Sequence, residues 1–545
     1  KYPVSLAVGG LSWGQVIAGE AALGVVVKDA KEQLRALPGG LTYGLLRYLN
    51  PEVDLAGPVP PIGFNYLGRL GAAGTDAGGW RLCLDGLSGI GAGAALPLPL
   101  PYSVDLNAGT VDSEAGPQLQ ANWRWAPSVV DRDRIGRLSR LWFEALAGIG
   151  AYVRAGGGGL TPSDIVPARL SQQQLDELDR DYGLADVLPL TPLQQGLLFH
   201  AGTTEPGGED VYAVQLDIRL SGPLDAQRLR AAVQAVVARH PNLVARFCDR
   251  FDEPVQIIPA DAVAPWCYLD LDGSEGVEER IQRVCAAERA AVCEPADQPL
   301  FRAVLIRTAA DQHRLVLTNH HLVLDGWSRP ILLREIVAGY YGQRLPVAAA
   351  YRAVVAWLAE RDLEAARRAW GQVWAGFDTP TLVGAPQRLR PGRQAVAVFG
   401  VPASLTAAVS GLARAQHTTV NIVWQGAFAQ LLCWLTGQHD VAFGTPVSGR
   451  PAEVAGAESM VGMLVNTVPV RATLTPATTT TGLLEQLHRT HQHTLDHQHL
   501  ALPQIHHLTG QERLFDTLFV YQNYPIDTAA LTGADGLAIT EITSH

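Results

Sequence analysis

The chain lacks any long run of apolar residues. A helix needs about eighteen or more consecutive apolar residues to be a candidate for crossing a bilayer, and the apolar run near Leu96 is interrupted by Pro97, Pro99 and Pro101. The sequence therefore predicts no transmembrane helix. No secretory signal is visible at its start, but the first residue is Lys1 rather than methionine, so we expect the natural N-terminus to lie elsewhere.

Excess positive charge and paired cysteines are also missing. The formal net charge is −11, which argues against a nucleic-acid surface and against a polybasic membrane contact, because both need clustered Lys and Arg. Proteins or neutral groups are the expected partners. The cysteines form no CxxC pair and show no disulfide-dense spacing, which favours a reducing, cytoplasmic environment; they are Cys83, Cys248, Cys267, Cys285, Cys293 and Cys433.

What is present is the composition of a packed globular protein, with 47% hydrophobic and 17% charged residues. Its 545 residues leave room for more than one domain. The clearest boundary is Gly156–Gly159, because four glycines cannot hold a helix, and it follows a helical stripe of apolar residues between Ile135 and Ile149. Residues 2–6 read as a strand, and a second domain is predicted to begin near Leu188.

Strand and helix patterns alternate beyond the glycines. Apolar and polar residues alternate within Val211–Leu220, Phe301–Arg307 and Arg314–His321, which is typical of half-buried strands. Helical spacing follows from about Asp225 and again over Ile331–Tyr340. This order predicts a layered α/β domain.

The third of these strands ends in the segment Asn319-His320-His321-Leu322-Val323-Leu324-Asp325-Gly326-Trp327. Because side chains alternate along a strand, His320 and His321 are predicted to point to opposite faces, so only one imidazole can meet a given substrate. An imidazole is poised for proton exchange at neutral pH. Two histidines followed by a carboxylate four positions after the second are the layout of an acyl-transfer site.

The pattern HHxxxDG resembles the signature of nonribosomal peptide synthetase condensation domains and of their chloramphenicol acetyltransferase-like relatives. Other segments resemble this family in its own order: residues 190–200, 239–243, 443–451, 460–469 and 499–503. Trp327 directly precedes Ser328, an order that favours condensation over the related epimerization domains. The resemblance implies an α/β fold with two chloramphenicol acetyltransferase-like lobes, at residues 188–370 and 371–545, the second expected to be truncated.

The front of the chain resembles the C-terminal part of an epimerization domain, through residues 37–48 and 64–69. Residues 1–155 are therefore expected to be a partial α/β domain of the same superfamily, joined by a glycine-rich linker at 156–187. They contain no histidine, so we expect them to epimerize nothing alone.

The resemblance also suggests the site residues. His321 is expected to be catalytic, either as a base or as an orienting hydrogen-bond partner, whereas His320 is expected to fix local structure. Asp325 is expected to form a structural ion pair with Arg450, because a buried carboxylate needs a partner; the alternative is a solvated cap of the next helix. Gly326 is expected either to let the backbone approach a ligand arm or simply to make a turn.

A crowd of histidines near the C-terminus favours a solvated helix face over a metal site, since no HExxH and no cysteine partner accompanies it; these are His488, His491, His493, His497, His499, His506 and His507. No metal and no cofactor bound by this segment is expected.

The expected function is peptide-bond formation between a donor ending in a D-residue and an L-aminoacyl acceptor, for antibiotic, siderophore or lipopeptide biosynthesis. The substrates are expected on phosphopantetheine arms of upstream and downstream peptidyl carrier domains, with adenylation domains as further partners. The alternatives are a stand-alone acyltransferase that uses acyl-CoA and a catalytically silent docking fragment.

Overall fold

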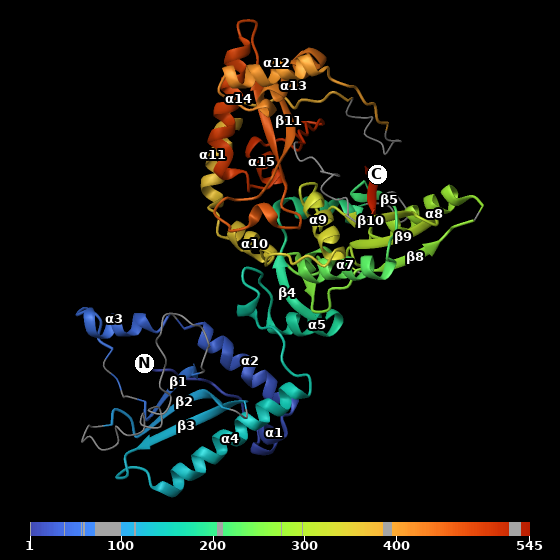
Figure 1. The fold of residues 1–545 in the computed structure, drawn as a ribbon. Coiled ribbons are helices and arrows are strands. Elements are labelled where there is room, and N and C mark those ends of the chain that lie inside the picture. The colour runs from blue at the N-terminus through green and yellow to red at the C-terminus, as the bar shows by residue number, and fades with distance from the viewer. Residues whose placement is uncertain are drawn as a thin grey trace, which may run out of the picture. The chain divides into compact units, whose positions relative to one another are not determined.

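The computed structural model describes residues 2–37, 39–55, 57, 60–70, 100–113, 116–203, 211–273, 275–296, 298–384, 395–522 and 536–544. Its contacts divide the chain into two compact units, Lys1–Ser163 and Asp164–His545 (Figure 1). The boundary between the units, at residues 163 and 164, falls within the range 156–187 that the sequence predicts to be a linker. Cys83 and the prolines at 97 and 99 lie outside the described residues.

The described part of the first unit contains a small sheet and four helices. It contains α1 (Trp13–Ala18), α2 (Ala21–Arg35), α3 (Leu41–Leu49), β1 (Ile62–Leu70), β2 (Val104–Ser113), β3 (Gly116–Trp125) and α4 (Arg132–Arg154). Strand β2 lies between β1, which is parallel to it, and β3, which is antiparallel. Residues 2–6 are not a strand, so that prediction was wrong; they are exposed and form no ladder.

The second unit begins with elements that alternate much as predicted. They are α5 (Gln172–Tyr182), β4 (Leu184–Pro189), α6 (Pro192–Thr203), β5 (Ala213–Ser221), α7 (Ala226–Arg239), β6 (Arg246–Cys248), β7 (Val255–Pro259), β8 (Trp266–Asp270), α8 (Val277–Ala291), β9 (Phe301–Ala309), β10 (Gln312–His320), α9 (Ser328–Tyr340), α10 (Tyr351–Ala359) and α11 (Leu363–Trp374).

Its remaining elements are α12 (Ala403–Ala415), α13 (Val420–Thr436), β11 (Asp440–Val447), β12 (Asn466–Thr473), α14 (Thr480–Thr494), α15 (Leu502–Thr509) and β13 (Ala538–Ser544). Strands β11 and β12 form an antiparallel pair. Strand β13 instead pairs with β5, so the last described strand belongs to the sheet of the preceding half. The division into two lobes at residue 370 stays a prediction, and this strand pairing links residues on its two sides.

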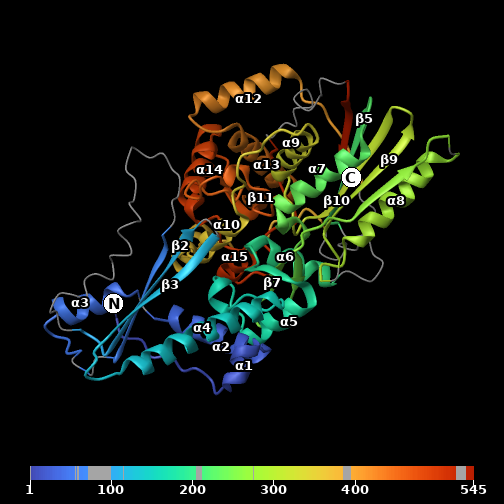
Figure 2. The same cartoon turned by 60° about the horizontal axis from the view of Figure 1, so that its bottom comes forward.

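The principal sheet has the order β13-β5-β10-β9-β8. Side chains alternate between the two faces of the sheet along β10. On one face, Leu315 and Leu317 belong to the large apolar core that includes side chains of α7 and α9. On the other face, Val316 packs in a separate cluster with Ile281 of α8. Figure 2 shows α7 and α8 on opposite sides of these strands. The sheet is therefore covered on both faces, and the C-terminal end of its central strand, β10, carries the two histidines.

Candidate active site

Two neighbouring segments fix the chain where β10 ends. The amide of His320 donates to the carbonyl of Leu300 at 2.9 Å, and the amide of His321 donates to the carbonyl of Tyr212 at 2.9 Å. Leu300 directly precedes β9 and Tyr212 directly precedes β5. Because both partners adjoin strands of the sheet, these backbone hydrogen bonds hold the start of the following turn in place.

The His321 ring is oriented by its own turn. Its Nδ1 lies 3.2 Å from the carbonyl oxygen of Leu324, and a carbonyl only accepts, so Nδ1 carries the proton and Nε2 keeps its lone pair. Burial and the nearby positive charge of Arg329 lower the pKa of this imidazole to about 4, although the Leu324 carbonyl acts in the opposite direction. The side chain remains partly exposed. At neutral pH, His321 therefore presents a neutral ring whose Nε2 can accept a hydrogen bond.

His320 has the opposite arrangement. Its side chain is completely buried, and its Nδ1 accepts a hydrogen bond of 3.0 Å from the amide of Leu322. The proton of the neutral ring is then on Nε2. His320 closes the turn that positions His321, and its burial leaves it no access to a substrate.

Asp325 and Arg450 come together from positions 125 residues apart. The guanidinium donates from Nη1 to Oδ2 at 3.0 Å and from Nη2 to Oδ1 at 3.1 Å, and both side chains are only 2% exposed. This two-pronged geometry is the strong form of an arginine–carboxylate pair. Arg450 also lies over the Trp327 ring, 5.6 Å from its centroid.

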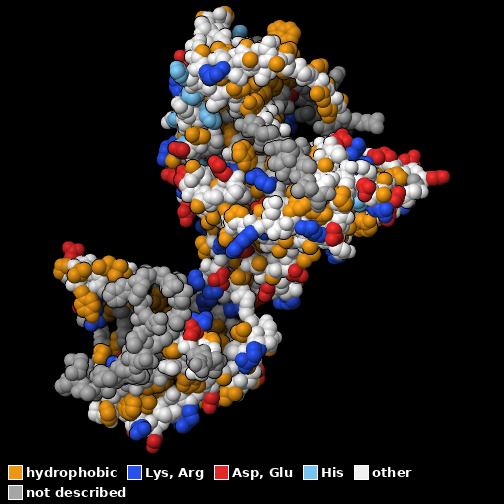
Figure 3. All heavy atoms as spheres, viewed as in Figure 1, with side chains coloured by type: hydrophobic (Ala, Val, Ile, Leu, Met, Phe, Trp, Pro, Cys, Tyr) orange, Lys and Arg blue, Asp and Glu red, His pale blue; other side chains and the backbone are white. Residues whose placement is uncertain are grey.

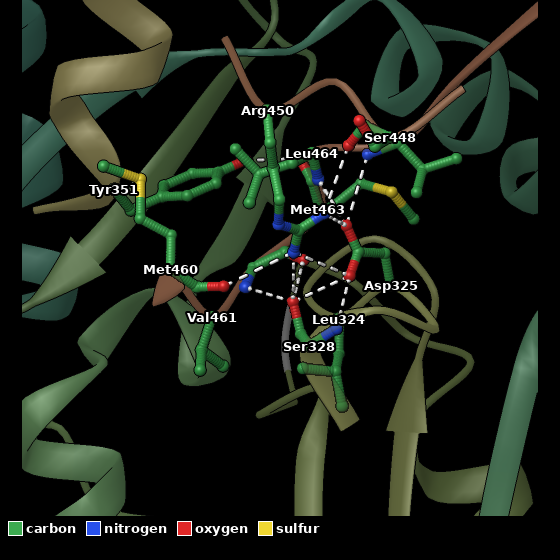
Figure 4. A network of polar contacts seen from close by, with 12 residues as sticks. Leu324, Asp325, Ser328, Tyr351, Ser448, Arg450, Met460, Val461, Met463 and Leu464 are labelled. Atoms are coloured by element: carbon green, nitrogen blue, oxygen red, sulfur yellow. Dashed lines mark hydrogen bonds and ion pairs between the residues drawn. The ribbon is translucent and has the colours of Figure 1, made fainter. Parts of the chain in front are cut away.

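The remaining capacity of the Asp325 carboxylate is filled by backbone and hydroxyl donors (Figure 4). Oδ1 accepts from the amide and the hydroxyl of Ser328, at 2.8 and 2.7 Å, while Oδ2 accepts from the amides of Leu464 and Val465, at 3.1 and 3.3 Å. Asp325 thus binds the first residue of α9 and also holds the loop of residues 460–465, which we call the floor loop. Of the two alternatives predicted for this residue, the contacts agree with the ion pair and not with the solvated cap, because the carboxylate is buried.

Two glycines let the floor loop approach so closely. Gly449 has a φ of +61°, and a Cβ there would lie 1.7 Å from the carbonyl oxygen of Leu464. A Cβ at Gly462 would lie 2.6 Å from the Tyr351 ring and 3.0 Å from the Asn242 amide. Both positions therefore require glycine.

Several supporting residues were not singled out from the sequence. Gln194, 1% exposed, donates to the carbonyl of Leu322 at 2.7 Å. The Asn242 amide donates to the carbonyl of Val461 at 2.9 Å, and the Tyr351 hydroxyl donates to that of Met463 at 2.9 Å. Gln194 and Asn242 lie in segments that carry the family resemblance, and that resemblance could have identified them from the sequence. No sequence pattern marks Tyr351 as a residue of the site.

Gly326 lies half-buried in the turn between His321 and α9. The histidine-rich region lies elsewhere, and pale-blue side chains mark the outer surface beside α14 in Figure 3. His491 and His493 are exposed there. Over the residues that the structure describes, no three His, Cys, Asp or Glu side chains are grouped so that they could hold a metal ion.

The lowered pKa of His321 predicts a stability change in acid. Between its ordinary value of 6.5 and about 4, the unfolded chain binds the proton and the folded chain does not. The free energy of unfolding should therefore fall as the pH drops through this window, by up to about 3 kcal/mol. Denaturant titrations of the parent and of His321→Gln from pH 7 to 4 test this, because only the parent carries this loss. Parallel curves would contradict the lowered pKa.

A neutral imidazole acceptor follows the central strand of a covered sheet, and a buried aspartate–arginine bridge fixes the turn beside it; this arrangement suits acyl transfer. The family comparison agrees. The chain belongs to the condensation domain family, whose model matches residues 184–541.

Individual relatives are similar over nearly the whole chain. Chondramide synthase cmdD of Chondromyces crocatus is 32% identical, over 95% of this chain and 14% of that protein. Bacitracin synthase 3 of Bacillus licheniformis is 30% identical, over 97% of this chain and 8% of that protein. This chain therefore spans only a small part of these relatives.

The solved structures confirm the predicted fold class. The first condensation domain of the CDA synthetase superposes with a TM-score of 0.51 at 21% identity, covering 66% of this chain and 86% of that one. Among the described residues, no helix combines the length and the hydropathy that a membrane crossing requires.

Proposed function

We propose that the second unit forms a peptide bond between a donor acyl group and an aminoacyl acceptor, both held as thioesters on phosphopantetheine arms. The observation that supports this most is the His321 ring, whose Nδ1 donates to the carbonyl of Leu324 and whose Nε2 can accept a hydrogen bond from the amine. The residues that hold this ring lie inside the region that matches the family.

In the proposed reaction the acceptor amine attacks the donor thioester carbon. A C–N bond forms, the C–S bond breaks, the amine loses one proton and the donor thiol gains one. As the C–N bond forms, positive charge develops on the amine nitrogen and makes its protons more acidic. A hydrogen bond to His321 Nε2 fits this step, while alignment of the two arms can supply roughly 7–11 kcal/mol.

The proposed partners are the peptidyl carrier domains on either side and the adenylation domains that load them, in the cytoplasm. The relatives support this setting, since their names describe synthases of chondramide and of bacitracin. No cofactor of this segment itself is part of the proposal, and the arms enter as part of the substrates.

Product formation tests the assignment against its alternatives. Donor and acceptor are offered on carrier domains in one reaction, the donor is offered as a CoA thioester in another, and dipeptide is measured by mass spectrometry. Product from carrier-bound donors supports condensation. Product from the CoA donor alone indicates a stand-alone acyltransferase, and no product from either indicates a docking fragment.

We further propose that the donor ends in a D-residue. The first unit supports this, since its sequence resembles the end of an epimerization domain and the relatives match across both units. An upstream epimerase delivers both epimers, and a shaped pocket discriminates a misplaced small group by about 1–3 kcal/mol, or roughly 10- to 200-fold.

The expected result is faster use of the D-donor by that factor, with D- and L-terminated donor thioesters assayed in parallel. The first unit should exchange no α-proton when the whole chain is given a loaded carrier. Equal rates for both epimers would remove the stereochemical assignment, whereas peptide-bond formation would stand.

A further inference from the structure

The segment that enters the second unit is held by one guanidinium. Arg352, the second residue of α10, donates from Nη2 to the carbonyl of Asp164 at 2.7 Å and also to the carbonyl of Val166. Its Nη1 pairs with the Asp186 carboxylate of β4. One planar side chain therefore joins the entering segment, the small sheet of β4 and the start of α10, a geometry that lysine, with its single ammonium, cannot reproduce in full.

The entering segment is itself well packed. Ile165 is completely buried, Ala168 is 4% exposed and Leu170 is 6% exposed. Buried apolar side chains resist local opening. The hydrogen bonds from Arg352 are therefore made to a segment that packing already fixes within the second unit.

The residue directly before Arg352 faces the candidate site. The Tyr351 hydroxyl donates to the carbonyl of Met463 in the floor loop at 2.9 Å, and its ring fills the place that a Cβ at Gly462 would need. Tyr351 is 7% exposed, and burial raises the pKa of its phenol, so it stays a neutral donor. The first turn of α10 thus has the entering segment on one side and the floor loop on the other.

We propose that Arg352 is a positioning residue for the reaction: by fixing the first turn of α10 to the entering segment, it holds Tyr351 against the floor loop and keeps that loop aligned on Asp325. Arg352 touches no reacting atom in this proposal. The inference rests on the proposed function for its catalytic consequence, whereas the mechanical link is measurable without turnover.

Hydrogen exchange of the whole chain, read by mass spectrometry, tests the link. In Arg352→Gln, amide exchange should rise about tenfold both in residues 164–170 and in the floor loop. In Tyr351→Phe it should rise in the floor loop alone. Combining the two substitutions should add little at the floor loop, because both break the same connection. The matched control is Arg334→Gln, which removes the same charge from an exposed position on α9.

Turnover supplies the second readout. Arg352→Gln should lower kcat severalfold with little change in the KM for the acceptor carrier, and Arg352→Lys should restore part of the loss. Faster exchange confined to residues 164–170, or no change in either segment, overturns the proposal. If Arg352→Gln unfolds, the same comparison is made with Arg352→Lys, where the two segments should loosen together. A parent that makes no peptide yet shows the linked exchange would contradict the proposed function and leave this link intact.

Discussion

Replacing Asp325 with Ala should lower the free energy of unfolding of the second unit by about 3–5 kcal/mol, because it leaves the Arg450 guanidinium buried without its counter-charge. The structure gives two reasons for so large a loss of stability. Both side chains are 2% exposed, and the amides of Leu464 and Val465 lose their acceptor as well. The floor loop should therefore detach from the turn that carries His321.

Chemical denaturation of the parent and the variant, followed by fluorescence, measures this effect. Asp272→Ala is the matched control, since Asp272 pairs with Arg307 at a surface position where its side chain is 40% exposed. Exposed pairs contribute only about 0–1 kcal/mol. Equal stability of Asp325→Ala and Asp272→Ala would show that the buried bridge does not stabilise the unit.

Local patterns predicted the part of the site that lies in one continuous segment. Alternation in β10 and helical spacing in α9 placed the two histidines at a strand end before a helix, and the structure has both elements there. The partner of Asp325 came only from the family resemblance, since no local pattern connects residues 325 and 450. Neither the local patterns nor the family resemblance predicted the role of Tyr351, because its contact with Met463 arises from packing between distant segments.

Sequence patterns were also insufficient for two segments near the ends of the chain, β13 and residues 2–6. The return of β13 to β5 joins residues more than three hundred positions apart, and no pattern within a seven-residue strand specifies its partner. The opening residues 2–6 have the composition of a strand and no ladder to join. Strand pairing is decided by tertiary context more than by propensity, so the sequence predicted the elements better than their neighbours.

Replacing His321 with Ala should lower the rate of peptide-bond formation by roughly 10²-fold, the cost of losing the alignment of a reacting group. The fold should survive, because the backbone bond from the His321 amide to Tyr212 remains. His507→Ala is the matched control, an exposed histidine remote in sequence from the turn, and should react like the parent. A His321→Ala rate within about threefold of the parent would exclude a direct role in the reaction.

A glutamine at position 321 separates the two roles that an imidazole can have here. With a pKa of about 4 for His321 and about 8 for an α-amine, complete proton transfer from the free ammonium would cost about 5 kcal/mol. The ring is therefore better suited to accept a hydrogen bond that orients the amine than to remove its proton outright. Glutamine retains a hydrogen-bond acceptor but is no base at neutral pH, so we expect His321→Gln to recover most of the rate lost in His321→Ala. Single-turnover dipeptide formation with preloaded carriers measures both variants, and a glutamine variant as slow as the alanine variant would identify His321 as the base.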